Sequence, residues 1–237
     1  MWSDPRVTRS LGMALAALAV LAGCGGEDEP KAPATAAVTP FPSIDRADLA
    51  PGTPYTTQQF KPKITLTLPE GEWLAAGADS PDHVEIEPTP QDPVDSSALA
   101  FHHMTKVFDP EMGGETPGDA VAGPTDFAQW LTDHAHLKAT KPEPVEALGL
   151  KGVSIDVRVK SSQPRQYKDC GKVEGDCVVM FVGKIEPIVH GSKSFGRFYV
   201  LEQPDGKELV VEQYVEPAGA FRAQRPAFEA ALESATT

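Results

Sequence analysis

The sequence has few cysteines and lacks the short motifs typical of common catalytic sites. Its 237 residues include only 3 cysteines, and none of them forms a Cys-x-x-Cys pair. Redox sites and cysteine-based metal sites need that close spacing or accompanying ligands, so neither is predicted. A Gly-x-Ser-x-Gly motif and a glycine-rich phosphate loop are also missing. The sequence therefore indicates neither a serine-hydrolase elbow nor a nucleotide site.

Positive charge and aromatic side chains are scarce as well. Lys and Arg number 21 against 34 Asp and Glu, which gives a formal net charge of −13. Nucleic acids and anionic lipid headgroups attract basic surfaces, so no nucleic-acid partner is predicted. Only 7% of the residues are aromatic. Trp73 and Trp130 are expected in the core, with the alternative that Trp73, which follows a Pro-Glu-Gly turn, contacts a partner.

No hydrophobic run is long enough to span a membrane. The apolar run at Leu11–Gly23 falls short of the roughly 20 residues that a spanning helix needs. It follows Arg6 and Arg9, as the apolar region of a secretory signal does. The run ends in Leu21-Ala22-Gly23-Cys24, which resembles the lipobox of bacterial lipoproteins. The alternative is an ordinary secretory signal with a chance cysteine.

This resemblance implies an address outside the cytoplasm. In bacterial lipoproteins the lipobox cysteine receives a diacylglyceryl group and becomes the first residue after cleavage, so Cys24 is the expected lipidation site and residues 1–23 the signal peptide. Two or more acyl chains, such as palmitate, give stable attachment where one chain binds reversibly. The expected location is the extracytoplasmic face of the cell membrane, with the membrane as partner through the anchor. In that oxidising setting, Cys170 and Cys177 are expected to form a disulfide that closes a short loop.

Composition divides the remaining chain into two parts. Residues 24–54 contain six prolines, with Ala and Thr between them, which predicts a flexible tether. The alternative is that Phe41, Ile44 and Leu49 dock onto the domain as an N-terminal arm. Residues 55–237 have a length that suits a single globular domain.

Hydrophobic periodicity predicts an α+β architecture for this domain. Alternating apolar residues indicate strands, as in residues 60–68 and 153–160, and Gln203-Pro204-Asp205-Gly206 is typical of a hairpin turn between two strands. Two segments have helical spacing, at 124–137 and 220–237. Thr125 or Asp126 can cap the first, and Pro226 suits the start of the second. We therefore expect an antiparallel sheet with both helices packed on one face.

A second resemblance concerns the overall layout. A lipobox, an Ala/Thr/Pro tether and a domain that closes with a C-terminal helix resemble uncharacterised envelope lipoproteins of actinobacteria, some of which have a PsbP-like α/β sandwich. The likeness depends on this layout and on pieces such as "PTDFAQWL" and "FEAALESATT". It implies no catalytic motif, so no functional residue carries over from it.

The histidines do not form a recognisable metal motif. His102 and His103 are neighbours on a predicted strand, so their side chains point to opposite faces, and His134-x-His136 diverges if the helix continues. A mixed site of His103, His134 and a carboxylate is the alternative. Zinc sites need three or four such ligands, and neither a metal nor a cofactor is predicted. His190-Gly191-Ser192 is expected to form a turn between strands.

These observations favour a non-enzymatic module over an enzyme. We expect a lipid-anchored surface domain that binds an envelope protein or a small ligand, or that assists an envelope assembly. The alternative is an extracytoplasmic hydrolase acting on the cell wall or on lipid. An enzyme should gather titratable residues with perturbed pKa values in a concave pocket. A binding module should instead offer an apolar surface or cavity.

Overall fold

The computed structural model describes residues 37–44, 46–89, 96–108, 120–123, 125–160, 177–182 and 187–237. The predicted signal peptide, Cys24 and Cys170 lie outside these ranges. No helix within them has the length and apolar character needed to cross a membrane.

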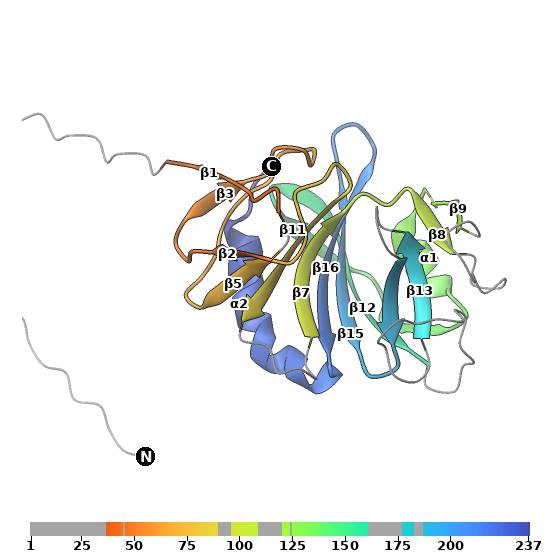
Figure 1. Ribbon diagram of the computed structural model, residues 1–237. Helices are drawn as coiled ribbons and strands as arrows, with labels where there is room; N and C mark the ends of the chain where they lie inside the picture. Colours follow the sequence, from red (N-terminus) through yellow and green to blue (C-terminus); the bar gives the residue numbers. More distant parts are fainter. Residues whose placement is uncertain are drawn as a thin grey trace, which may run out of the picture. The chain divides into compact units, whose positions relative to one another are not determined.

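A nine-stranded antiparallel sheet forms the centre of the domain (Figure 1). Its order is β10-β12-β15-β16-β7-β6-β5-β2, and β11 pairs with β12 beside this path. The strands are β2 (Ala47–Leu49), β5 (Glu72–Ala75), β6 (His83–Thr89), β7 (Ser96–His102), β10 (Leu137–Ala139), β11 (Glu143–Ala147), β12 (Leu150–Val159), β15 (Phe195–Glu202) and β16 (Glu208–Glu216).

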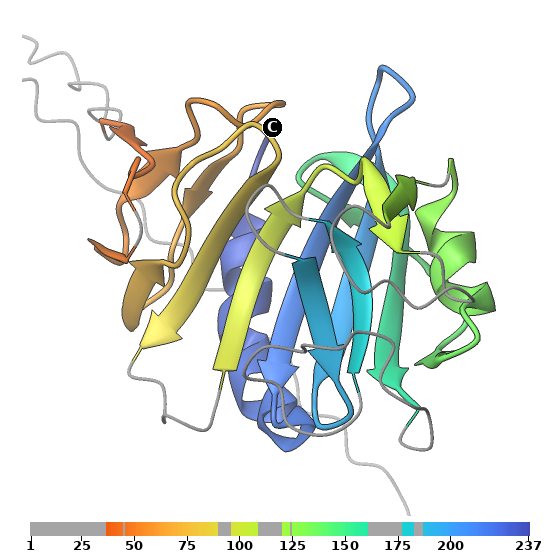
Figure 2. The ribbon, with the colours of Figure 1, turned by 45° about the vertical axis from the view of Figure 1, so that its right-hand side comes forward.

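Two smaller sheets and two helices flank this central sheet (Figures 1 and 2). The four-stranded sheet has the order β14-β13-β8-β9, and the three-stranded sheet has the order β1-β3-β4. Their strands are β8 (Lys106–Phe108), β9 (Ala120–Ala122), β13 (Cys177–Val182) and β14 (Pro187–Gly191), then β1 (Thr39–Pro40), β3 (Pro54–Thr56) and β4 (Thr65–Thr67). The helices are α1 (Phe127–Asp133) and α2 (Phe221–Ser234), the second preceded by the 3-10 turn η2 (Ala218–Ala220).

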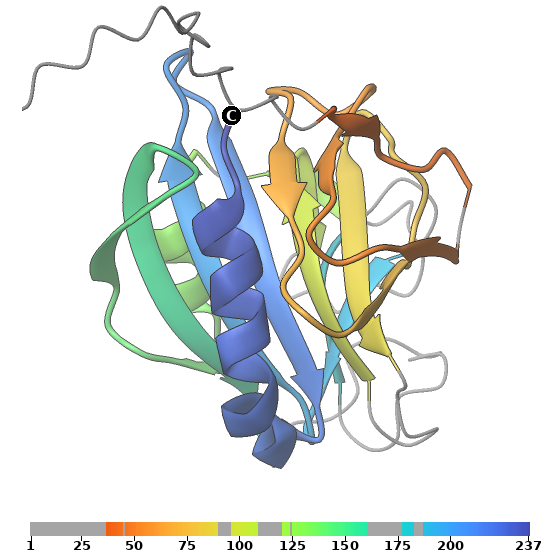
Figure 3. The same cartoon turned by 90° about the vertical axis from the view of Figure 1, so that its left-hand side faces the viewer.

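The two helices pack on opposite faces of the central sheet, so the expectation that they share one face is wrong. Successive side chains of a strand point to opposite faces. On β15, Tyr199 belongs to the apolar cluster that includes Phe228 of α2, whereas Phe198 belongs to the cluster that includes Phe127 of α1. Figure 3 shows α2 on one side of the sheet and α1 behind it. The central strands are apolar on both faces, and each face therefore needs its own cover.

The helix ends follow partly from local sequence. The Asp126 side chain accepts a hydrogen bond from the Gln129 backbone N–H at 2.8 Å, which confirms the predicted cap of α1. This helix ends at Asp133, and His134 is already extended. In α2 the prediction for Pro226 is wrong, because this residue lies inside the helix. The 3-10 turn η2 leads directly into α2, so the helix begins at Phe221. Pro226 lies on the exposed side of α2, where the helix tolerates the loss of one backbone N–H donor.

The N-terminal part of the described chain belongs to the folded domain. Phe41 and Leu49 are each 3% exposed and join the same apolar cluster as Trp73. Strand β1 pairs with β3, and β2 pairs with β5. The docked arm is therefore confirmed for Phe41 and Leu49, whereas Ile44 is 66% exposed. The domain therefore includes residues before 55, and the predicted start of the domain at residue 55 is too late. Phe41 and Leu49 are isolated apolar residues in a proline-rich segment, so the sequence shows no strand pattern there.

We expect Phe41→Ala to lower the free energy of unfolding by about 3 kcal/mol, because it empties a buried aromatic site. The matched variant Ile44→Ala should change it by less than about 0.5 kcal/mol, because that side chain is exposed. Denaturant unfolding of both variants measures the difference. Equal stabilities would show that the arm does not contribute to the core.

Candidate functional site

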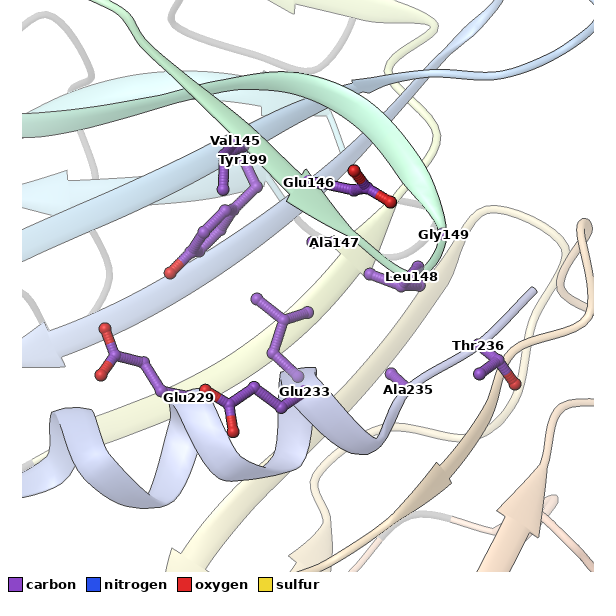
Figure 4. Close-up of a pocket in the computed structure, with 11 residues that line it drawn as sticks. Val145, Glu146, Ala147, Leu148, Gly149, Tyr199, Glu229, Glu233, Ala235 and Thr236 are labelled. Atoms are coloured by element: carbon purple, nitrogen blue, oxygen red, sulfur yellow. The ribbon is translucent and has the colours of Figure 1, made fainter.

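A groove lies between α2 and the β11–β12 hairpin (Figure 4). Its volume of about 550 Å³ falls within the range of small-molecule pockets. The apolar part of its lining consists of Val145, Ala147, Leu148, Leu232 and Ala235, and the polar part includes Tyr199, Glu146, Glu229 and Glu233. The groove therefore combines an apolar lining with carboxylates.

A tight turn shapes one wall of the groove. Leu148 and Gly149 connect β11 to β12 with φ angles of +55° and +72°. Two consecutive positive φ angles are typical of the two-residue hairpin turn that fits the twist of the strands. A leucine rarely adopts a positive φ angle. At Leu148 the burial of the side chain in the core, where it is 3% exposed, stabilises this conformation. Its carbonyl oxygen also accepts a hydrogen bond from the Thr237 hydroxyl at 3.2 Å. Packing thus holds the wall in place.

The other wall carries the polar groups. Glu229 and Glu233 extend from α2, and the Tyr199 hydroxyl points from β15 toward the helix (Figure 4). Burial raises the pKa of Tyr199, so its hydroxyl stays protonated at neutral pH. Glu229 Oε1 lies 2.6 Å from Arg225 Nε and 3.8 Å from Arg197 Nη1. This wall can therefore donate one neutral hydroxyl and present negative charge.

A second group of polar side chains is buried on the opposite face of the sheet. Glu212 of β16 lies between His190 of β14 and His102 of β7. Its carboxylate oxygens are 2.5 Å from His190 Nε2 and 3.3 Å from His102 Nε2. Burial by itself would raise the pKa of Glu212, but the neighbouring imidazoles of His190 and His102 lower it to about 2. Burial lowers the pKa of His102, and the nearby Glu212 carboxylate opposes this shift.

The buried group continues toward the surface along β6. His83 Nδ1 lies 3.0 Å from His102 Nδ1, and His83 Nε2 lies 2.9 Å from a Glu85 oxygen. We call these five residues, Glu85, His83, His102, Glu212 and His190, the histidine chain. The side chains of its three inner members are at most 3% exposed. Because a substrate cannot reach them without a rearrangement, the histidine chain is not an active site in this conformation.

The structure places the remaining predicted residues as follows. Trp73 is not a contact residue: it is 3% exposed and its Nε1 donates a hydrogen bond to the Pro69 carbonyl at 3.0 Å. Cys177 is 1% exposed at the start of β13. Because Cys170 lies outside the described residues, the disulfide stays a prediction, as does lipidation of Cys24.

The histidines separate as the strand geometry requires. His102 enters the histidine chain, whereas His103 stacks on Phe60 with ring centroids 4.5 Å apart. His134 packs against Trp130 at 4.8 Å, so it has different neighbours from His103. Within the described ranges, no three His, Cys, Asp or Glu side chains are arranged to hold a metal ion.

Sequence reasoning missed the pairing of His190 with Glu212. His190 and Gly191 belong to β14, so the turn predicted at His190-Gly191-Ser192 begins only at Ser192, and His190 is fully buried. A signal was present, because Glu212 interrupts the apolar run Leu209–Val211 in the middle of a strand. A carboxylate at such a position needs a buried partner. The sequence does not reveal which of the six histidines is that partner.

The His190 ring lies directly against the backbone of β15 at Gly196. A Cβ atom at Gly196 would come within 2.6 Å of His190 Cε1 and 2.9 Å of a Phe198 ring carbon. We therefore expect Gly196→Ala to lower the free energy of unfolding by about 1–3 kcal/mol through overpacking. Gly219→Ala is the matched control, because a Cβ there meets no atom within 4 Å. Equal thermal stability of the two variants would contradict the tight packing of His190.

Comparison with known proteins matches the chain to no family model and to no curated protein. No residue role is therefore taken from a relative. The candidate function depends on the chemistry of the groove.

Proposed function

We propose that this protein is a non-enzymatic binding module of the cell envelope whose ligand site is the groove between α2 and the β11–β12 hairpin. The single observation that carries this proposal is the groove itself, with its apolar lining and acidic wall. Ligand pockets are typically apolar with a few polar groups that fix orientation. This groove has that composition.

The groove chemistry favours binding over hydrolysis. An enzyme needs a nucleophile or a general base within hydrogen-bond reach of the reacting atoms. Among the described residues that line the groove, the hydroxyls belong to Tyr199 and Thr236, and no histidine lies beside them. The carboxylate with the most strongly lowered pKa, Glu212, is buried on the opposite face of the central sheet. The lining of this groove therefore gives no support to the hydrolase alternative.

The charges of the groove select the class of ligand. Glu229 is partly neutralised by Arg225, and Glu146 faces Lys151 across the hairpin. Glu233 adds a further carboxylate, so the lining itself contains three acids and no basic residue. A cation placed there gains Coulomb energy, and an alkyl or apolar segment can cover the partly buried side chains of Val145 and Ala147. We therefore propose a cationic amphipathic ligand, either a small amine or a basic apolar segment of an envelope protein.

The anchor completes the proposal. The lipobox at Leu21–Cys24 supports a mature chain that begins at Cys24 and is held by its acyl chains on the extracytoplasmic face of the cell membrane. A lipid-held domain with an exposed groove suits capture of molecules or proteins of the envelope. This location also gives the predicted disulfide of Cys170 and Cys177 an oxidising compartment.

The groove is tested with a cationic alkyl probe. We expect dodecyltrimethylammonium below its micelle concentration to bind the wild-type protein in calorimetry, and the double variant Glu146→Gln/Glu233→Gln to bind about tenfold more weakly, which corresponds to about 1.4 kcal/mol. Glu72→Gln is the control, because this exposed glutamate lies on β5 and does not line the groove. Equal binding by all three proteins, or tighter binding of the anionic dodecyl sulfate, would refute the proposed ligand class.

The anchor is tested separately. We expect Cys24→Ser to abolish membrane association of the protein in a host that processes lipoproteins, because the acylated thiol is lost. The circular dichroism spectrum of the secreted domain should stay unchanged. Tight membrane binding by the variant would remove the argument for an acyl anchor and leave the groove proposal intact.

A further inference from the structure

We propose that a cavity beside the turn between β15 and β16 is a second ligand site, and that it takes a neutral, hydroxyl-rich small molecule such as a saccharide. Its volume of about 750 Å³ falls within the range of small-molecule pockets. We call it the turn cavity, because residues 203 and 205–208 form one side of it. Its described lining shares no residue with the groove beside α2. The two sites can therefore be tested separately.

Neighbouring strands of the central sheet bring the walls of the turn cavity together. Strand β16 pairs with both β15 and β7, so the β15–β16 turn lies at the same end of the sheet as the chain that leaves β7. Residues 103–105 follow β7 and line the cavity, with Lys61 and Asp82 on two further loops. Figure 2 shows the chain beyond β7 passing the base of the β15–β16 hairpin. Strand pairing therefore fixes two of the walls.

The turn cavity contains a buried amide that has no hydrogen-bond partner among the described residues. Gln203 lines the cavity and is 8% exposed, and the unpaired atom is its Nε2. The backbone of this residue is held in the turn, because its N–H donates to the Lys207 carbonyl at 2.8 Å and its carbonyl accepts from the Gly206 N–H at 2.9 Å. An enclosed donor without an acceptor costs free energy. Since the last torsion of a glutamine side chain is broad, a hydroxyl in the cavity can supply the missing acceptor.

A second wall is fixed by a buried carboxylate. Asp79 is 3% exposed and accepts hydrogen bonds from the backbone N–H groups of Gln59 at 2.9 Å and Phe60 at 3.1 Å. Phe60 stacks on the His103 ring with centroids 4.5 Å apart, and His103 Nε2 donates to the Lys61 carbonyl. These contacts hold His103 and Lys61 in the lining of the cavity. A site that is formed in advance loses less entropy when a ligand binds.

The charges around the turn cavity nearly balance. Lys207 Nζ lies 3.2 Å from Asp205 Oδ2, so these two charges offset each other. Lys61 and Asp82 add one charge of each sign, and Glu208 adds one further carboxylate. A ligand cation would meet lysines there, and a ligand anion would meet carboxylates. The mixture of charges therefore favours a neutral ligand.

The same groups suit hydroxyls in particular. A hydroxyl can donate to a carboxylate and can accept from a lysine ammonium or from the unpaired amide. His103 Nε2 carries the hydrogen that it donates to a backbone carbonyl, so Nδ1 of the neutral ring is a further acceptor. Pro62, Pro81 and Met104 give the cavity apolar surface, which can cover the C–H faces of a sugar ring. A saccharide combines many hydroxyls with such faces.

NMR titration of the full-length mature protein tests the ligand class. We expect glucose and N-acetylglucosamine to bind with millimolar dissociation constants and to shift the signals of residues 103–105 and 203–208. The cationic glucosamine and the anionic glucuronate should bind at least about threefold more weakly, because each meets like charge. Failure of both neutral sugars to bind at millimolar concentrations would overturn the proposal. Tighter binding of glucosamine, of glucuronate or of the zwitterion alanyl-alanine would overturn it as well.

The variant Gln203→Met removes the amide and keeps the length of the side chain. We expect it to bind glucose about tenfold more weakly, because a ligand hydroxyl loses its donor. Gln129→Met is the matched control and should bind like the wild-type protein, since this exposed glutamine of α1 does not line the turn cavity. Equal affinity of Gln203→Met and the wild-type protein would overturn the proposal.

The variant His103→Phe tests the site from its second wall. It keeps an aromatic ring against Phe60 and removes the acceptor nitrogen, so glucose binding should again weaken about tenfold. Wild-type affinity in His103→Phe would contradict the site even if Gln203→Met fails to fold.

The stability of the free protein separates a ligand-binding amide from a structural one. Because the Gln203 amide is unpaired without a ligand, Gln203→Met should melt at the wild-type temperature or above it. A decrease of about 3 °C or more would show that the amide is already bonded in the free protein and would overturn the proposal. The groove variant Glu146→Gln/Glu233→Gln should bind glucose like the wild-type protein, so failure of the groove and failure of the turn cavity are distinguishable.

Discussion

Strand β16 occupies the middle of the central sheet, and its burial constrains the rest of the structure. Its residues Leu209–Gln213 are all buried, so both faces of the sheet must be covered. On one face α2 and the three-stranded sheet exclude water, and on the other the four-stranded sheet and α1 do so. The N-terminal arm is part of this requirement, because Phe41 and Leu49 complete the cover over the first face.

The same constraint explains why a charged residue could become part of the interior. Glu212 follows three apolar residues on β16 and points into the face that the four-stranded sheet covers. Once water is excluded, its carboxylate is stable only with donors that lie in the same layer. His102 and His190 meet that need from two different sheets. The contact between His190 and Glu212 therefore links the four-stranded sheet to the central sheet.

The two faces consequently differ in character. The α2 face ends in an open groove, where the hairpin and the helix leave apolar side chains and carboxylates accessible to a ligand. On the opposite face, the described part of the histidine chain is buried at His102, Glu212 and His190 and partly exposed at His83 and Glu85. The groove proposed for ligand binding and the buried titratable groups therefore lie on separate faces.

The sequence by itself determined the features that depend on neighbouring residues. The lipobox motif, the cap of α1 at Asp126, the turn between β15 and β16 and most of the strands are local patterns, and the last three appear in the structure as expected. Only the tertiary structure decided which face each helix covers, where Phe41 docks, and that Glu212 pairs with His102 and His190. These outcomes depend on contacts between residues far apart in the chain. The hydrophobic periodicity of a segment predicts which residues are buried. Which residues they contact depends on how the sheets and helices pack against one another.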